Sequence, residues 1–135
     1  PPSVYLAQDQ GYKVFGRGRD YMRFLQTGVV TTDANIKQKR EKLLRFLRAW
    51  NRGLKVYQDS PEIMIPYIQK RLGVKDAQMA RRMYDDDAPF ILSGGRLGAD
   101  AAREIVDIGR EALQIKEPIP TERIFDFSLA SEALR

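Results

Sequence analysis

The apolar positions of this chain follow one spacing before residue 32 and another after it. Residues 4–10 have the pattern of a short helix, which Gly11 ends in the usual C-terminal manner. Residues 12–15 and 27–32 are rich in aromatic or β-branched side chains, so we predict a strand at each. The glycines in residues 16–20 indicate a loop between the two strands.

From Asp33 onward the spacing is helical, and apolar residues every three or four positions predict one long helix. That helix ends at Asp59, and Ser60 followed by Pro61 predicts a capped start for the next helix, which Gly73 ends. Asp76 is the expected cap of a third helix, whose residues Met79, Met83 and Tyr84 face inward. A fourth helix is predicted over about residues 99–115, before Pro118 and Pro120.

The two predicted strands have no further strands in the chain with which to form a sheet of normal width. An isolated pair of strands is marginally stable in water. We therefore expect these segments to pair with strands outside this sequence, or between two copies of the chain. The second case predicts dimerisation or strand exchange when the chain is isolated. The opening Pro1-Pro2-Ser3 lacks an initiator Met, and we expect further residues upstream.

The amino-acid composition excludes several kinds of catalytic and metal-binding chemistry. The 135 residues include no Cys and no His, so thiolate nucleophiles, disulfides and the commonest metal ligand are missing. We expect no enzyme activity, no cofactor and no metal. The formal net charge of +5 is compatible with a nucleic-acid or membrane partner, but a moderate excess of cations on a soluble protein is the simpler explanation.

Three motifs resemble functional sites, but in each case a purely structural role is the better explanation. Gly16-Arg17-Gly18 lacks the third glycine of a dinucleotide-binding turn, because position 21 is Tyr. Consecutive side chains on a helix diverge by about 100°, so Asp85-Asp86-Asp87 cannot converge there on one metal ion. The segment from Lys37 to Lys55 carries eight cations and one acid, but these cations are distributed around its polar side, which favours a solvated face over a nucleic-acid surface.

The order of several short motifs is similar to the second half of a known family. These are Pro1-Pro2-Ser3-Val4, Gly11-Tyr12-Lys13-Val14-Phe15, Thr27-Gly28-Val29-Val30-Thr31-Thr32, Lys42 to Ala49, Asp59-Ser60-Pro61-Glu62 and Ile124-Phe125-Asp126-Phe127-Ser128. Together they resemble the type II periplasmic solute-binding proteins, and within them the NMT1/THI5-like group that contains the aliphatic sulfonate, nitrate and taurine binders of ABC transporters. The turn is Pro-Pro-Ser where many sulfonate binders carry an aromatic or acidic residue, so the resemblance does not assign a sulfonate as the ligand.

The resemblance implies an α/β fold of the periplasmic binding protein-like II class, with two lobes around a ligand cleft. Residues 1–26 would finish the second lobe, residues 27–32 would form the crossing strand, and residues 33–135 would be the C-terminal helical part of the first lobe. The ligand-facing positions of the family correspond here to Pro2, Ser3 and Val4, at a helix N-terminus, and to Thr27 and Gly28.

The function that this resemblance implies is capture of a small, anionic organic solute outside the cytoplasm for an ABC permease, without chemistry. Nucleic acid is not expected as a partner on this reading. Two alternatives stay open. One is a basic helical module that binds nucleic acid or regulates a partner. The other, ranked last, is thiamine-precursor synthesis by an enzyme of the same family.

Overall fold

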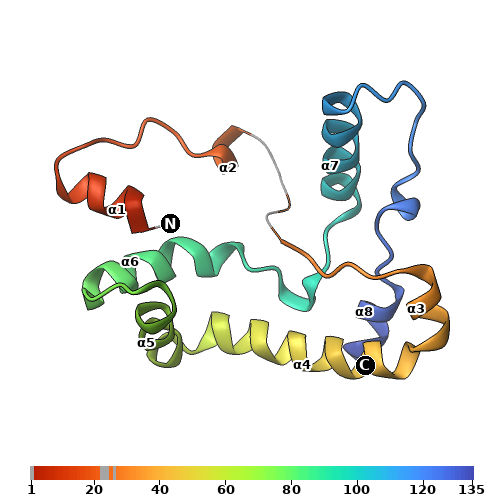
Figure 1. The fold of residues 1–135 in the computed structure, drawn as a ribbon, viewed down its shortest axis with the longest axis horizontal. Coiled ribbons are helices and arrows are strands. Elements are labelled where there is room, and N and C mark those ends of the chain that lie inside the picture. Colours follow the sequence, from red (N-terminus) through yellow and green to blue (C-terminus); the bar gives the residue numbers. More distant parts are fainter. Residues whose placement is uncertain (1, 22–24, 26) are drawn as a thin grey trace. The chain divides into compact units, whose positions relative to one another are not determined.

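The computed structural model describes residues 2–21, 25 and 27–135, and the regular elements among them are all helical (Figure 1). In chain order they are α1 (Pro2–Asp9), α2 (Gly18–Tyr21), α3 (Asp33–Gln38), α4 (Arg40–Asp59), α5 (Pro61–Leu72), α6 (Ala77–Asp87), the 3-10 turns η1 (Ala88–Phe90) and η2 (Ser93–Gly95), α7 (Ala99–Ala112), η3 (Thr121–Arg123) and α8 (Ser128–Ala133). Among the described residues, no helix combines the length and the apolar character needed to cross a membrane.

The expected α/β fold is therefore wrong. Residues 12–15 and 27–32 form neither strand nor helix, and the described part of the chain contains no sheet. Phe15 is fully exposed and Val30 is 93% exposed. The β preference of aromatic and β-branched residues expresses packing against neighbouring strands. Neither segment has such a neighbour here, so each is an extended coil.

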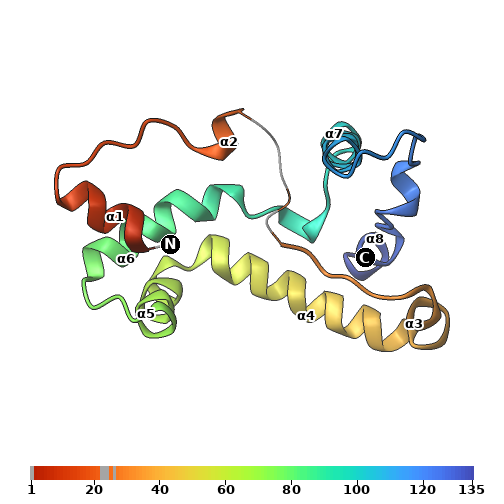
Figure 2. The same cartoon turned by 45° about the horizontal axis from the view of Figure 1, so that its top comes forward.

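The structure divides into two compact units. One comprises Pro1–Asp20 and Arg52–Ile91, and the other comprises Tyr21–Asn51 and Leu92–Arg135. The boundary between Asn51 and Arg52 falls within α4, which is itself one uninterrupted helix (Figure 2). Each unit has buried apolar residues of its own.

The core of the first unit lies between α5 and α6, and α1 packs against α6. It consists of Tyr5, Ile68, Val74, Met79, Ala80, Met83 and Tyr84. The predicted helix signals act as expected here. Pro61 begins α5, Gly73 ends it at a left-handed φ of 68°, and the Asp76 side chain accepts a hydrogen bond from the backbone N–H of Gln78. Ser60 differs from the prediction, because its hydroxyl makes no capping hydrogen bond.

The second unit buries Leu44, Ala102, Val106 and Leu129. An ion pair between Arg40 of α4 and Glu132 of α8 connects two of its helices. The long helix predicted from Asp33 is interrupted at Lys39, whose φ of −126° and ψ of 28° are not helical. No Gly or Pro marks this break in the sequence, whereas the start of α3 is capped by the Thr32 hydroxyl, which accepts from the Asn35 N–H.

Candidate functional site

The first turn of α1 contains three of the predicted ligand residues, Pro2, Ser3 and Val4. The Ser3 side chain is exposed, whereas Pro2 and Val4 are half-buried. The first backbone N–H groups of a helix have no acceptor within it, and the helix dipole makes that end partly positive. Pro2 has no N–H, so the Ser3 and Val4 amides are the donors that this turn offers to an anion.

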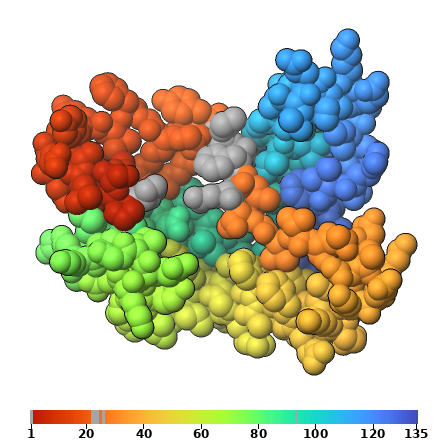
Figure 3. Space-filling model, viewed as in Figure 1, coloured from red at the N-terminus to blue at the C-terminus, as the bar shows by residue number. Residues whose placement is uncertain are grey.

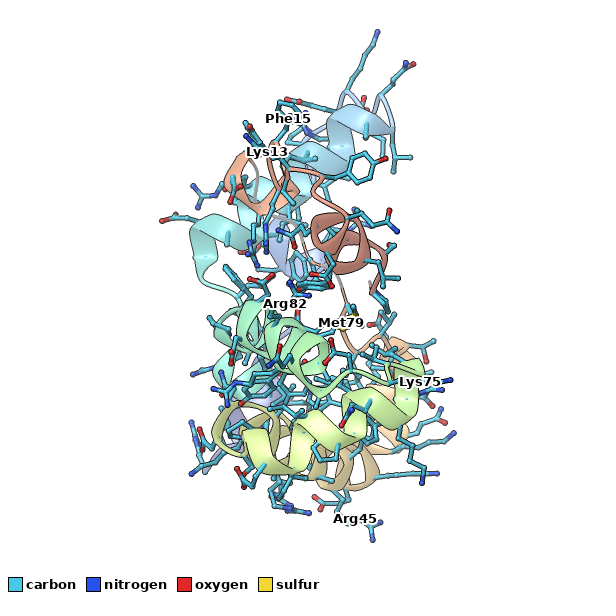
Figure 4. The ribbon with its side chains drawn as sticks, turned by 90° about the vertical axis from the view of Figure 1, so that its left-hand side faces the viewer. Lys13, Phe15, Arg45, Lys75, Met79 and Arg82 are labelled. Atoms are coloured by element: carbon cyan, nitrogen blue, oxygen red, sulfur yellow. The ribbon has the colours of Figure 1, made fainter. Side chains whose placement is uncertain are left out.

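Side-chain contacts fix α1 on α6. Tyr5 is buried in the core, and its hydroxyl donates to Asp86 Oδ2 at 2.9 Å. One turn further on, Arg82 Nη2 donates to both carboxylate oxygens of Asp9, at 2.8 and 2.9 Å. The guanidinium carbon of Arg82 also lies 5.7 Å from the centre of the Tyr5 ring, and Figure 4 shows Arg82 projecting from α6. These contacts hold the N-terminal turn of α1 in place within its unit.

The other two predicted ligand residues, Thr27 and Gly28, are exposed in the extended segment before α3. A side chain at position 28 would lie 3.3 Å from Leu25 Cδ2, a close but not prohibitive approach. Thr27 and Gly28 belong to the second unit, and the α1 turn belongs to the first. The structure thus brings Pro2, Ser3 and Val4 together in one turn and Thr27 and Gly28 together in another segment.

Each member of the aspartate triplet at the end of α6 has its own partner. Asp85 accepts from Arg81 Nε at 2.9 Å, one helical turn away. Asp87 accepts from the Tyr57 hydroxyl at 3.0 Å. Asp86 is bound by residues from the N-terminal segment. Asp86 and Asp87 thus connect α6 to neighbouring segments, whereas Asp85 pairs within α6. Among the described residues no group of three or more acidic side chains has the arrangement of a metal site.

Asp86 is the centre of a polar cluster that we call the Asp86 cluster, made of Tyr5, Arg17, Arg19 and Asp86. Arg17 Nη1 donates to Asp86 Oδ2 at 2.8 Å, on the same oxygen that Tyr5 contacts. Arg19 Nη1 donates to the Asp86 backbone carbonyl at 3.0 Å, and its guanidinium carbon lies 4.2 Å from the centre of the Phe90 ring. The cluster attaches the extended segment after α1 to the end of α6.

The sequence analysis missed the Asp86 cluster. Two arginines around Gly18 and three consecutive acids are visible as complementary charges. However, 69 residues separate Arg17 from Asp86, and one sequence does not show that they meet.

The environment of this cluster shifts two pKa values. Burial, the hydrogen bond to Asp86 and the charge of Asp86 together raise the pKa of the Tyr5 hydroxyl to about 12, with burial the largest cause. For Asp86 itself, burial raises the pKa, but the hydrogen bonds from Arg17 and Tyr5 and the charges of both arginines outweigh it, so the pKa lies below its ordinary value. Near neutral pH the cluster is a neutral phenol and two guanidiniums around one carboxylate.

A second tyrosine of this unit, Tyr57, also has a raised pKa. Burial and the neighbouring Asp87 raise the pKa of Tyr57, whose ring stacks on Tyr84 with centroids 5.7 Å apart. Tyr84 donates to the Gln58 carbonyl at 2.7 Å. Phenols with raised pKa values are hydrogen-bond donors at neutral pH and poor bases. The arrangement therefore suits binding and positioning better than proton transfer.

An open pocket of about 700 Å³ lies at the start of α6, lined by Asp9, Asp76, Ala77, Gln78, Arg81 and Arg82. Its two guanidiniums are already paired with Asp85 and Asp9. Asp9 is at the C-terminal end of α1, so this pocket is at the opposite end of the helix from Ser3. None of the predicted ligand residues lines it.

Comparison of the chain with family models, curated proteins and solved structures gives no match in any of the three.

Proposed function

We propose that this chain is the solute-binding component of an ABC importer and captures a small anionic organic molecule without altering it. The observation that carries the proposal is the N-terminal turn of α1. Ser3 is exposed there, while Tyr5 and Asp9 anchor the same helix to α6. Donors that are already held in place lose little entropy when an anion binds to them.

The ordered motifs described above support the importer role. They include both the Pro-Pro-Ser-Val turn and Thr27-Gly28. The proposal does not include the two-lobed α/β fold, which the structure contradicts. The part assigned to Thr27 and Gly28 rests on the resemblance alone. The implied partner is a membrane permease, and the implied location is outside the cytoplasm.

A panel of anions tests the proposal on the full chain. Thermal shift and calorimetric titration are run with sulfonates, nitrate, pyrimidine precursors and aromatic carboxylic acids. A ligand that binds only the folded state raises the apparent melting temperature with its concentration. We expect at least one class of anion to do so. Failure of the whole panel to stabilise the chain would contradict the proposal.

Two substitutions at one position locate the site. Ser3→Asp introduces a negative charge that favours the N-terminus of α1 but repels an anion, so the helix is retained and ligand affinity falls by tenfold or more. Ser3→Asn is the matched control, because asparagine is nearly the size of aspartate but carries no charge. This variant should bind the anion almost as tightly as the unaltered chain does. Equal affinity of both variants would place the ligand elsewhere. Thr27→Val tests the second predicted position separately.

A further inference from the structure

The N-terminal half of α4 presents a cationic surface within the second unit, and we call Lys42, Arg45 and Arg48 the α4 cationic face. All three side chains are exposed. None of them forms an ion pair with a residue that the structure describes. Nearby Arg40 is different, since Glu132 neutralises it. Figure 3 shows atoms of α4 at the surface, and in Figure 4 the Arg45 side chain points outward from its helix.

Three of the cations of α4 lie on one arc of the helix surface. Residues three positions apart on a helix are about 60° apart around its axis, so Lys42, Arg45 and Arg48 cover about 120° of the circumference in under two turns. Residues 40–51 of α4 carry four cations against the single acid Glu41. The polar side of this part of α4 therefore has a clear positive excess.

An exposed aromatic pair lies next to this face. Phe46 is 47% exposed and Trp50 is 38% exposed, and their rings stack with centroids 6.0 Å apart at an angle of 26°. Phe46 follows Lys42 by four positions, so the two side chains are neighbours on the helix surface. Leu44 is 2% exposed and marks the inward side of α4. Around the helix axis the order is Arg48, Arg45, Lys42, Phe46 and Trp50, so Lys42 and Arg45 lie beside the aromatic pair and Arg48 lies farther round the helix.

We propose that the α4 cationic face, together with Phe46 and Trp50, binds peripherally to the anionic phospholipid surface of a membrane. Lys and Arg attract anionic headgroups, and aromatic rings prefer the boundary between headgroups and acyl chains. Single-stranded nucleic acid is less well matched, because its bases stack on open ring faces and each of these rings already uses one face on the other.

The tryptophan provides a direct probe, since Trp50 is the single tryptophan of the chain. The full chain is titrated with vesicles of phosphatidylcholine alone and with vesicles of equimolar phosphatidylcholine and phosphatidylglycerol. We expect a blue shift of Trp50 emission and co-sedimentation with the anionic vesicles only, and both should weaken as salt is added. Sedimentation without any change in Trp50 emission would overturn the proposal, because another surface would then bind the lipid.

A charge variant and its matched control complete the test. Each Lys or Arg near an anionic membrane strengthens binding roughly fivefold, so Lys42→Gln/Arg45→Gln/Arg48→Gln should bind roughly 100-fold more weakly. The control, Lys70→Gln/Arg71→Gln/Lys75→Gln, removes three exposed cations of the first unit and should retain the affinity. Circular dichroism verifies that both variants fold.

Three outcomes would overturn the proposal: equal losses in the two variants, equal binding to neutral vesicles, or tighter binding to a single-stranded oligonucleotide than to the anionic vesicles. The last would assign the face to nucleic acid. Because the vesicle experiment contains no solute, its result is independent of the anion panel.

Discussion

At the scale of single residues, Asp86 joins two segments of its unit to the end of α6. Its carboxylate accepts from Tyr5 and Arg17 on one oxygen, and its backbone carbonyl accepts from Arg19. The Asp86 and Arg17 side chains are each 33% exposed, so solvent reduces the strength of this ion pair, but the shared hydrogen bonds add to it. The same carboxylate thus positions both α1 and the extended segment that follows.

Asp86→Asn should lower the free energy of unfolding by about 1 kcal/mol, because it removes the charge from two hydrogen bonds while keeping the shape of the side chain. Asp85→Asn is the control, since the Arg81–Asp85 pair is exposed and joins residues one turn apart, and such pairs contribute about 0.3–0.5 kcal/mol. Urea denaturation measures both. A larger effect of Asp85→Asn would mean that the Asp86 cluster does not stabilise this unit.

The stability that Tyr5 contributes to the Asp86 cluster is lost at alkaline pH. Its pKa is raised from 10.0 to about 12 in the folded chain, mainly by burial, so the unfolded chain loses this proton first as pH rises. The stabilisation is complete below pH 10 and is lost as pH rises through the folded value of about 12. Tyr5→Phe should therefore flatten the fall of stability over that range. Tyr67→Phe, at an exposed tyrosine of α5, should leave the fall unchanged in the same denaturation series.

At the scale of elements, the two helix N-caps beside α5 and α6 differ although their sequences look equally favourable. The Asp76 carboxylate accepts from the Gln78 N–H at 2.8 Å, whereas the Ser60 hydroxyl accepts no capping hydrogen bond. Asp76→Ala should thus cost about 1 kcal/mol of stability, and Ser60→Ala only a few tenths. Urea denaturation compares the two variants directly. Equal costs would show that the hydrogen bond at Asp76 contributes nothing.

Two glycines offer a similar contrast in the second unit. Gly94 has a φ of 71°, and a Cβ there would lie 2.8 Å from Leu134 Cδ1, whereas a Cβ on Gly109 would meet nothing within 4 Å. Gly94→Ala should destabilise the chain by about 1 kcal/mol or more, because the left-handed conformation and the contact both oppose a side chain. Gly109→Ala lies inside α7 and should stabilise it by up to about 1 kcal/mol. Thermal melts measure both changes. A melting temperature that moves in the same direction in the two variants would contradict these expectations.

Helices were predictable from this sequence because their signals are local. Gly73 and Asp76 occupy the cap positions that their spacing indicates, and Met79 and Met83 are buried as predicted. The strands were not predictable, because a strand depends on a neighbour that no local pattern specifies. The break at Lys39 could not be predicted either, since no Gly or Pro marks it in the sequence.

The candidate site shows the same division between local and distant signals. The first turn of α1, with Ser3 in it, is visible in the sequence as a proline-led helix start. What anchors that turn is not visible, because Tyr5 and Asp86 are 81 residues apart along the chain. The resemblance therefore pointed to this turn, whereas the contacts that anchor it lie too far apart in the sequence to be predicted.

At the scale of the whole molecule, the segments 12–15 and 27–32 expose apolar side chains to solvent. Phe15 and Val30 are almost wholly exposed, and the backbone around them takes part in neither helix nor sheet. Extended backbone with apolar side chains is a template for pairing with another chain. The chain should therefore self-associate as its concentration rises, which sedimentation velocity or light scattering detects. A monomer at every concentration would contradict this expectation.

Substitution distinguishes these segments from the rest of the surface. Phe15→Ser/Val30→Ser removes the two most exposed apolar side chains of the segments, and burying such groups on association is favourable by about 1.5–3 kcal/mol each, so the association constant should fall at least tenfold. Leu113→Ser/Ile124→Ser is the control, because those residues are 72% and 58% exposed and lie outside both segments. The control should associate as the unaltered chain does. If it loses association equally, general surface hydrophobicity drives the process, and the extended segments have no special part in it.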